Sequence, residues 1–438
     1  MIIFPPGSPE YESATTPHNA IASQHPAVVA RPTSTAEVAE VVAYAAARGL
    51  GILPQATGHG AGGEIGDDVL ILDTSGLVEL TIDPKARTAS AGPGLTWGEI
   101  NPRVEKFGLL GLLGSSPSVA IGGYTFGGGF GWLTRPHGAA SAALRSVEYV
   151  DGTGRVRLAS DDAVDAVDRD AVWAFRGGGG VGIATRLDFD LKPAPDLYAG
   201  YFLWPIDDLE AVTTAWAAAQ ALVGEAVGTS ISVLHTPPGP PFPDDLQGVP
   251  VVHLAVASSH GEDEARPLLN AVREAAAPVV DTWGPADAAK LATIHLDPPA
   301  AVPALGDARW LSSETPDNAV GILAVASASH SPLALIEIRS FANNAATRDG
   351  AATITSGPFA LHAVGALGDS SDRPVIEAAF KKLRAAAAPV DLGRSIGSWV
   401  EGASSVPDAL APEVRERVVR IADAVDPEGR IRRSRYLL

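Results

Sequence analysis

Hydrophobic and polar positions follow two periods over the first two hundred residues, and this mixture predicts short strands interleaved with helices. Ser34-Thr-Ala-Glu37 has the form of a capping box, and the apolar positions behind it recur at helical spacing up to a C-terminal cap at Gly49. Thr96-Trp-Gly-Glu99 predicts a second helix, which stops at Gly108. Runs that suit strands occupy residues 69–73, 88–93, 146–150 and 183–191.

The pattern changes between Pro193 and Pro205, where an alanine-rich region begins. Helices are expected at about 206–223 and 412–425, and strands at 251–257, 321–327, 333–339 and 359–364. We therefore expect an α+β protein whose second domain, over about residues 198–400, is a sheet covered by helices.

Two glycine-rich loops mark the first region. One is Gln55-Ala-Thr-Gly-His-Gly-Ala-Gly-Gly63, and the other runs from Gly111 to Gly131. Glycine lets backbone N–H groups approach a ligand without an intervening Cβ. The pair therefore predicts a wall around a large, flat, anionic ligand, and the histidine within it, His59, indicates chemistry as well as binding.

Two other interpretations of the glycine runs are disfavoured. Residues 107–134 carry no charge, but their glycines, serines and Pro117 are unlike a transmembrane helix. The run Gly177–Gly182 matches G-x-G-x-x-G, yet the residues after it alternate like a strand, whereas a dinucleotide fingerprint opens a helix.

Composition narrows the function classes. The 438 residues are 46% hydrophobic and 19% charged, as in a globular protein with two or three cores. The net charge of −19 argues against nucleic acid and against an anionic membrane surface. Cysteine is absent, and the histidines lack metal-site spacing, so neither thiolate chemistry nor a metal is expected. No signal peptide is visible, and a cytoplasmic location is expected.

The ordered motifs resemble those of the FAD-linked oxidases of the vanillyl-alcohol oxidase and berberine-bridge-enzyme class, with a PCMH-type FAD-binding domain. The resemblance is carried by Arg31-Pro-Thr-Ser-Thr-Ala-Glu-Val, the His59 loop, Ser116 to Gly131 and Trp173-Ala-Phe-Arg-Gly-Gly-Gly-Gly. It returns at Asp426-Pro-Glu-Gly-Arg-Ile and is thin over 198–400. It implies an FAD-binding domain at 1–197, a substrate domain with an antiparallel sheet at 198–400, and a segment at 401–438 that returns to the first domain.

The resemblance also implies which residues hold FAD. His59 matches the histidine that relatives bond to the flavin; the alternative is a non-covalent structural histidine. Backbone N–H groups of the two loops would hold the pyrophosphate. The expected FAD-contacting set is Gln55, Ala56, Thr57, Gly58, His59, Gly60, Ser115, Ser116, Val119, Gly122, Gly123, Gly127, Gly182 and Ile183.

Four departures from the family pattern are informative. Ser116 stands where bicovalent relatives have a second, cysteinyl attachment, so at most one covalent bond is expected. By resemblance, Val119 borders the path along which O₂ would reach the flavin, and a valine side chain would leave that path open. Ser434 and Tyr436 replace asparagines that often face the flavin. Ser398-Trp-Val-Glu-Gly402 replaces a motif that often supplies a catalytic tyrosine.

The candidate base is His362, which falls on the strand whose polar residue faces the flavin in relatives; a structural histidine is the alternative. Tyr124 is a second catalytic candidate, and His137, Arg339 and Trp399 are candidates for substrate binding. Glu337 and Arg339 share a strand face and are expected to pair, as surface ion pairs commonly do. Four tryptophans are expected in the core, although any one of them could instead cover a flat substrate: Trp132, Trp283, Trp310 and Trp399.

We therefore predict an oxidase that removes a hydride from a carbon next to a hydroxyl or amine of a small organic molecule and passes electrons to O₂. A dehydrogenase with another acceptor, a redox-neutral cyclase or binding protein with a structural flavin, and a flavin-free scaffold are the alternatives. Substrate identity and oligomeric state do not follow from the sequence.

Overall fold

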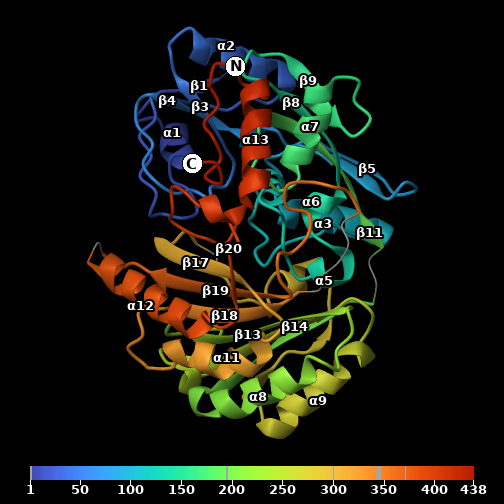
Figure 1. Ribbon diagram of the computed structural model, residues 1–438, viewed down its shortest axis with the longest axis vertical. Helices are drawn as coiled ribbons and strands as arrows, with labels where there is room; N and C mark the ends of the chain where they lie inside the picture. The colour runs from blue at the N-terminus through green and yellow to red at the C-terminus, as the bar shows by residue number, and fades with distance from the viewer. Residues whose placement is uncertain (1, 194–195, 299, 342–346, 370) are drawn as a thin grey trace.

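The computed structural model describes residues 2–193, 196–298, 300–341, 347–369 and 371–438. Two lobes are stacked along the long axis, and both chain ends lie in the upper one (Figure 1). The upper lobe holds a four-stranded sheet in the order β1-β2-β4-β3. Its strands are β1 (Ile3–Phe4), β2 (Val28–Ala30), β4 (Val69–Asp73) and β3 (Gly51–Gln55), and α1 (Pro9–Ala14) precedes β2.

Helix α2 (Thr35–Ala46) confirms the first helix prediction, because its apolar stripe, Val38, Val41, Val42 and Ala45, is fully buried. Ser34 Oγ accepts a hydrogen bond from the Glu37 N–H, as a cap should. The Glu37 carboxylate, however, accepts from the N–H of Thr33 instead of Ser34, so the capping box closes one residue early.

A second, five-stranded antiparallel sheet completes the upper lobe, in the order β5-β6-β10-β8-β9. Its strands are β5 (Leu80–Asp83), β6 (Thr88–Ala91), β10 (Ile183–Asp190), β8 (Leu144–Val150) and β9 (Val156–Ser160). The helices of this part are α3 (Trp97–Val104), α4 (Ile121–Phe126), α5 (Thr134–His137), α6 (Ala140–Ala143) and α7 (Ala166–Phe175). The strand after Gly182 confirms that the G-x-G-x-x-G run opens no helix. Strands β7 (Leu109–Leu110) and β11 (Lys192–Pro193) form a short pair.

The lower lobe is a large antiparallel sheet, in the order β15-β12-β14-β13-β18-β19-β17-β20, with β16 also paired to β12. Its strands are β12 (Tyr198–Pro205), β13 (Val227–His235), β14 (Pro250–Ser258), β15 (Val280–Asp281), β16 (Gly284–Pro285), β17 (Ala304–Leu311), β18 (Leu335–Ser340), β19 (Phe359–Ala366) and β20 (Asp391–Ser395). Helices α8 (Leu209–Ala219), α9 (Arg266–Ala275), α11 (Thr315–Leu323) and α12 (Asp372–Ala387) cover the face away from the upper lobe (Figure 1). The short α10 (Ala288–Leu291) packs on α3.

One predicted strand is wrong. Residues 321–327 end helix α11 and continue as a short 3₁₀ turn. Thr315-Pro316-Asp317 begins this helix with a proline in its first turn, and Ile322 and Leu323 are buried against the sheet. A short apolar run fits a buried strand and a buried helix end equally well, which is why periodicity alone misled the prediction.

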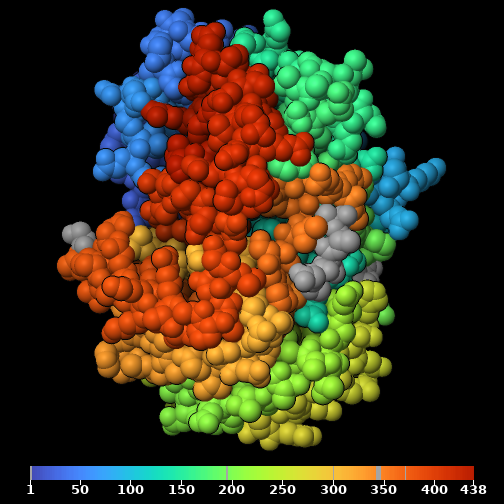
Figure 2. Space-filling model, in the orientation of Figure 1, coloured from blue at the N-terminus to red at the C-terminus, as the bar shows by residue number. Residues whose placement is uncertain are grey.

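The last part of the chain runs back over the upper lobe (Figure 2). Helix α13 (Pro412–Val425) has the bounds that the sequence predicts and packs on α7. The Ile52 N–H then donates to the Arg430 carbonyl at 2.7 Å, and the Arg432 N–H donates to the Ile52 carbonyl at 2.8 Å. The tail therefore extends the edge of the four-stranded sheet beside β3, where the His59 loop begins.

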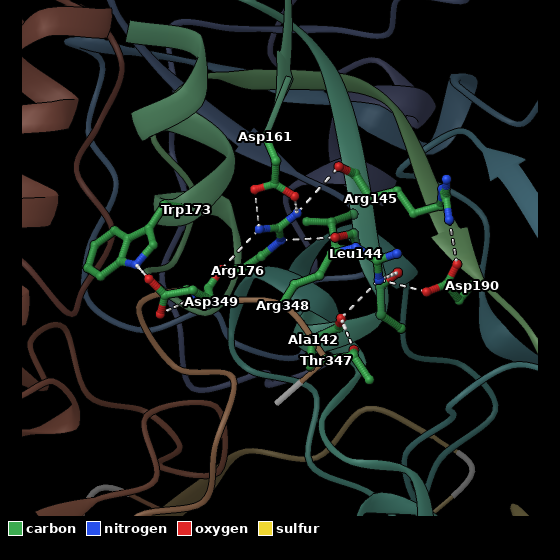
Figure 3. A network of polar contacts seen from close by, with 12 residues as sticks. Ala142, Leu144, Arg145, Asp161, Trp173, Arg176, Asp190, Thr347, Arg348 and Asp349 are labelled. Carbon is green, nitrogen blue, oxygen red and sulfur yellow. Dashed lines mark hydrogen bonds and ion pairs between the residues drawn. The ribbon is translucent and has the colours of Figure 1, made fainter. Parts of the chain in front are cut away.

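A buried arginine ties the two lobes together (Figure 3). The Arg176 guanidinium pairs with Asp161 at 2.7 Å and donates to the carbonyls of Leu144 at 2.9 Å and Asp349 at 3.0 Å. Trp173 Nε1 also donates to the Asp349 carboxylate, at 3.1 Å. The motif Trp173–Gly180 thus anchors the chain arriving from the lower lobe. In the described residues no helix is long and apolar enough to cross a bilayer.

Candidate functional site

The loop that follows β3 presents His59 toward the second glycine loop. Gly58 has φ +70°, and a Cβ there would lie 2.5 Å from Pro17 Cβ, so only glycine fits this turn. His59 Nε2 lies at hydrogen-bond distance, 3.0 Å, from Ser118 Oγ. The other ring nitrogen, Nδ1, does not take part in this hydrogen bond. The ring also stacks on His18, with centroids 3.7 Å apart.

Burial, and then the neighbouring His18, lower the pKa of His59 to about 4. The imidazole is therefore neutral at physiological pH, which is the nucleophilic form. The side chain of Gln55, by contrast, pairs with Gln24 through two amide hydrogen bonds at 2.8 and 3.0 Å and so braces the loop. The Thr57 carbonyl similarly accepts the His18 N–H at 3.0 Å.

The second loop lies beside the first and leads into α4. Ser116 Oγ lies 2.9 Å from Ser118 Oγ, and the Val119 carbonyl accepts the Trp97 N–H at 3.2 Å. A Cβ on Gly123 would meet nothing within 4 Å, whereas one on Gly122 would lie 2.9 Å from Pro93 and one on Gly127 would lie 3.1 Å from the Tyr436 hydroxyl. Gly123 is therefore the open position of the expected set, and the other two make close backbone contacts.

A buried polar cluster lies on the face of the large sheet that meets the upper lobe. Its centre is Glu337 on β18, whose side chain is 1% exposed. The carboxylate accepts from Ser230 Oγ at 2.5 Å and pairs with Arg339 at 3.1 Å. The pair that the sequence predicts is therefore real, but it is buried and not on the surface.

His362 on β19 lies opposite Glu337 in register and contacts it. Its Nδ1 lies 3.2 Å from Glu337 Oε1. Because an ionised carboxylate only accepts hydrogen bonds, this contact places the proton of the neutral ring on Nδ1. Nε2 is buried without a hydrogen-bond partner among the described residues, so it is the basic nitrogen.

Arg339 is held between two tryptophans as well as by Glu337. Its guanidinium carbon lies 4.3 Å from the Trp132 ring centroid and 4.7 Å from that of Trp399. Trp399, from the segment that replaces the tyrosine motif, also lies 5.5 Å from the His362 ring. Trp399 and Arg339 are thus brought to the predicted base, and Arg339 is occupied by partners of the protein itself.

Tyr124 on α4 carries a buried hydroxyl with no hydrogen-bond partner in the described part of the chain. Burial raises the pKa of this hydroxyl, and the charge of Arg339 opposes that shift. The ionised, phenolate form of Tyr124 is therefore disfavoured, and the neutral hydroxyl can serve as a hydrogen-bond donor.

Three predicted residues lie apart from this cluster. His137 lies at the end of α5, and burial, followed by Lys192 and His260, lowers its pKa to about 4. Its charged neighbours are therefore not those of the Glu337 cluster. Gly182 packs on Tyr149, and Ile183 begins β10 with its side chain in the hydrophobic core.

The sequence did not identify five residues of the site. His18 and Ser118 contact His59, His295 contacts Glu337, and Asp297 contacts His295. No spacing rule indicated any of these four. Glu401 is the fifth: burial raises its pKa, and the charge of His362 opposes the shift. The only signal for Glu401 was its place in the segment 398–402, which departs from the family motif.

Comparison with known proteins agrees with this geometry. Residues 26–160 match the family described as FAD binding domain. (R)-6-hydroxynicotine oxidase of Paenarthrobacter nicotinovorans is 33% identical over 184 residues, which are 41% of this chain and 39% of that protein. The FAD-linked oxidoreductase YvdP of Bacillus subtilis is 32% identical over 167 residues, 37% of this chain and 36% of that protein. The chain thus matches less than half the length of these curated relatives.

Solved structures share the whole fold. 6-Hydroxy-D-nicotine oxidase from Arthrobacter nicotinovorans superposes with a TM-score of 0.85 at 22% identity, over 100% of this chain and 97% of that one. The berberine-bridge-enzyme-like protein 1 of Physcomitrella patens gives 0.82 at 17% identity, with the same coverage. The fold is therefore that of the PCMH-type FAD proteins. Residues 26–160 carry an FAD binding domain, and the chain as a whole is similar in fold to 6-hydroxy-D-nicotine oxidase and to the berberine-bridge-enzyme-like proteins.

The residues present fit FAD. The space beside Gly123 is open, since a Cβ there would meet nothing within 4 Å, and a neutral imidazole stands at His59. Arg435 of the tail approaches Gly60 and keeps a buried guanidinium nitrogen, Nη1, without a partner among the described residues. A partly unpaired guanidinium beside a glycine loop suits the negative charge of a dinucleotide.

Proposed function

We propose that the protein is an FAD-dependent oxidase of a small organic alcohol or amine, with FAD bonded to His59. The observation that carries the proposal is the pair of nitrogens left available: His59 Nδ1 at the glycine loops and His362 Nε2 on the facing sheet. Bound FAD supplies the electron acceptor, taking a hydride from substrate carbon and yielding two electrons to O₂ to give H₂O₂.

The protein's part of the reaction is proton transfer and orientation. The substrate loses hydride from the carbon and a proton from the adjacent O–H or N–H, which leaves a C=O or C=N bond. His362 Nε2 receives that proton, and Glu337 stabilises the imidazolium through its contact with Nδ1. Trp399 and Trp132 give the substrate flat apolar walls, and Tyr124 donates to its heteroatom.

A single covalent bond to the flavin follows from the residues available. His59 is neutral and braced, whereas Ser116 cannot form the thioether of the bicovalent relatives. Acid precipitation of the purified protein tests this: the yellow colour should stay in the pellet, and His59→Ala should release it to the supernatant. His25→Ala, a histidine outside the loops, is the matched control and should retain the colour.

The oxidase activity is tested by anaerobic bleaching, followed by mixing with O₂. The probes are (R)-6-hydroxynicotine, after the oxidase of that name, and xylobiose, which is bound in a solved xylooligosaccharide oxidase of similar fold, together with simple secondary amines and benzylic alcohols. Bleaching and rapid recolouring by O₂ with H₂O₂ release support the oxidase. Recolouring only by an artificial acceptor would make the protein a dehydrogenase, and a flavin that no probe bleaches would favour a redox-neutral role.

A further inference from the structure

A chain of alternating acids and histidines runs behind the proposed base. Asp297 Oδ1 lies 2.6 Å from His295 Nδ1, and His295 Nε2 lies 3.2 Å from Glu337 Oε1. The same Glu337 oxygen lies 3.2 Å from His362 Nδ1. The four groups come from the loop after α10 and from strands β18 and β19, so the tertiary fold alone brings them together.

The charges of these four side chains and of Arg339 balance only if His295 is protonated. Although burial opposes it, Arg339 and His295 hold the pKa of Glu337 well below its ordinary value, and His295 does the same for Asp297. Two carboxylates then face one guanidinium, that of Arg339. Arg339 balances Glu337, and a charged His295, which lies between Glu337 and the half-buried Asp297, balances the second carboxylate.

The surroundings of His295 agree with that charge. Burial alone would lower its pKa, but Asp297 and Glu337 together raise it to about 10. His253 on β14 is the instructive contrast: it is equally buried, and burial, followed by the charge of His295, lowers its pKa to about 4. His253 contacts Ser232 and the Ile294 carbonyl, both neutral.

We propose that His295 is a permanently charged positioning residue, held by Asp297, that keeps Glu337 ionised together with Arg339. Ionised Glu337 in turn fixes His362 in the tautomer with its proton on Nδ1 and its lone pair on Nε2. The other groups facing His362 are Trp399 and Glu401, and neither contacts its Nδ1. The consequence for catalysis rests on the proposed function, whereas the charge and tautomer are properties of the folded protein.

The test is long-range ¹H–¹⁵N correlation spectroscopy of the flavin-containing protein labelled with ¹⁵N-histidine. His295→Gln, His362→Gln and His253→Gln assign the signals. At pH 8 we expect both nitrogens of His295 to be protonated, His253 to be neutral, and His362 to be neutral with its proton on Nδ1. A neutral His295 at this pH, or the Nε2–H tautomer of His362, would overturn the proposal.

Asp297→Asn supplies the second readout. This substitution should make His295 lose its proton at a lower pH than in the native protein. Asp207 is an exposed acid far away in the sequence, so Asp207→Asn should leave the titration of His295 unchanged. An unchanged titration in Asp297→Asn would contradict the role given to Asp297. The spectra need no substrate, so a failure to bleach the flavin would sink the proposed oxidase and leave this inference standing.

Discussion

At the scale of single residues, the proposed function makes His362 the base. His362→Gln keeps the size and polarity but loses the basic nitrogen, so flavin reduction by a bleaching substrate should slow by about 10² to 10⁴-fold. His235→Gln is the matched control, because His235 lies on β13 with Nε2 at 2.8 Å from the Ala326 carbonyl. Stopped-flow bleaching at equal flavin content measures both; equal rates in the two variants would remove His362 as the base.

Glu337 has a structural role that can be measured separately. Glu337→Gln leaves the buried Arg339 cation without its anion and leaves His295 with Asp297 alone, which should cost about 3–5 kcal/mol of unfolding free energy. Glu377→Gln removes an exposed partner of Arg373 on α12 and should cost about 0.5 kcal/mol or less. Urea unfolding of both variants makes the comparison, and a similar small loss in each would mean that Glu337 is not the centre of the cluster.

How far the sequence predicted this site depends on the kind of pattern. Glu337 and Arg339 were expected to pair because strand alternation places residues i and i+2 on one face. Their burial was not foreseen, because it depends on which lobe covers that face. His295 and Asp297 could not be found, since the short loop that carries them has no periodicity and meets Glu337 only through the tertiary fold.

At the scale of elements, the loops are held by close backbone approaches that glycine alone allows. A Cβ on Gly62 would lie 2.3 Å from the Ala403 carbonyl oxygen, whereas one on Gly321 in α11 would meet nothing within 4 Å. Gly62→Ala should therefore destabilise the protein by about 1–3 kcal/mol. Gly321→Ala should stabilise it by about 0.5–1 kcal/mol, because glycine weakens a helix interior. Urea midpoints of the two variants should move in opposite directions.

Among the elements, helices with regular periods were predicted correctly; α2 and α3 begin with capping residues, and α13 begins with a proline in its first turn. The apolar run at 321–327 was misassigned because its length suits a strand, and its helical start lies six residues earlier at Thr315. Of the large sheet, β14, β18 and β19 were expected as strands, whereas β12, β13, β17 and β20 were not. The order of the sheet follows from pairings between distant residues, such as Ser230 with Arg339, which no local pattern specifies.

At the scale of the whole molecule, the contact between lobes should depend on pH through Asp161. The hydrogen bond from Arg176 lowers the pKa of this carboxyl. A carboxyl with a lowered pKa contributes stability above its unfolded value and loses that contribution as the pH falls through its folded value. Asp161→Asn should therefore be less stable than the native protein at pH 7, and the difference should shrink as an acidic pH protonates Asp161 in the folded protein. Urea midpoints at the two pH values check this; a difference that persists in acid would exclude the ion pair as its cause.

The C-terminal tail should decide whether the assembled protein keeps its flavin. Residues 430–432 pair with Ile52 on β3, the strand that leads into the His59 loop. Tyr436 packs against Gly127 and Gly397. Deleting residues 430–438 removes these contacts together with the Arg435 guanidinium. We expect about equal expression, with the flavin content falling several-fold, because the loops lose one wall of the site.

Arg432→Gln is the control for that deletion. It removes an exposed ion pair with Asp68 but keeps the backbone pairing with β3, so its flavin content should match that of the native protein. Flavin absorbance per polypeptide after denaturation measures all three proteins. A truncated protein with full flavin content would show that the two glycine loops suffice, and that the tail serves only to cover the edge of the sheet.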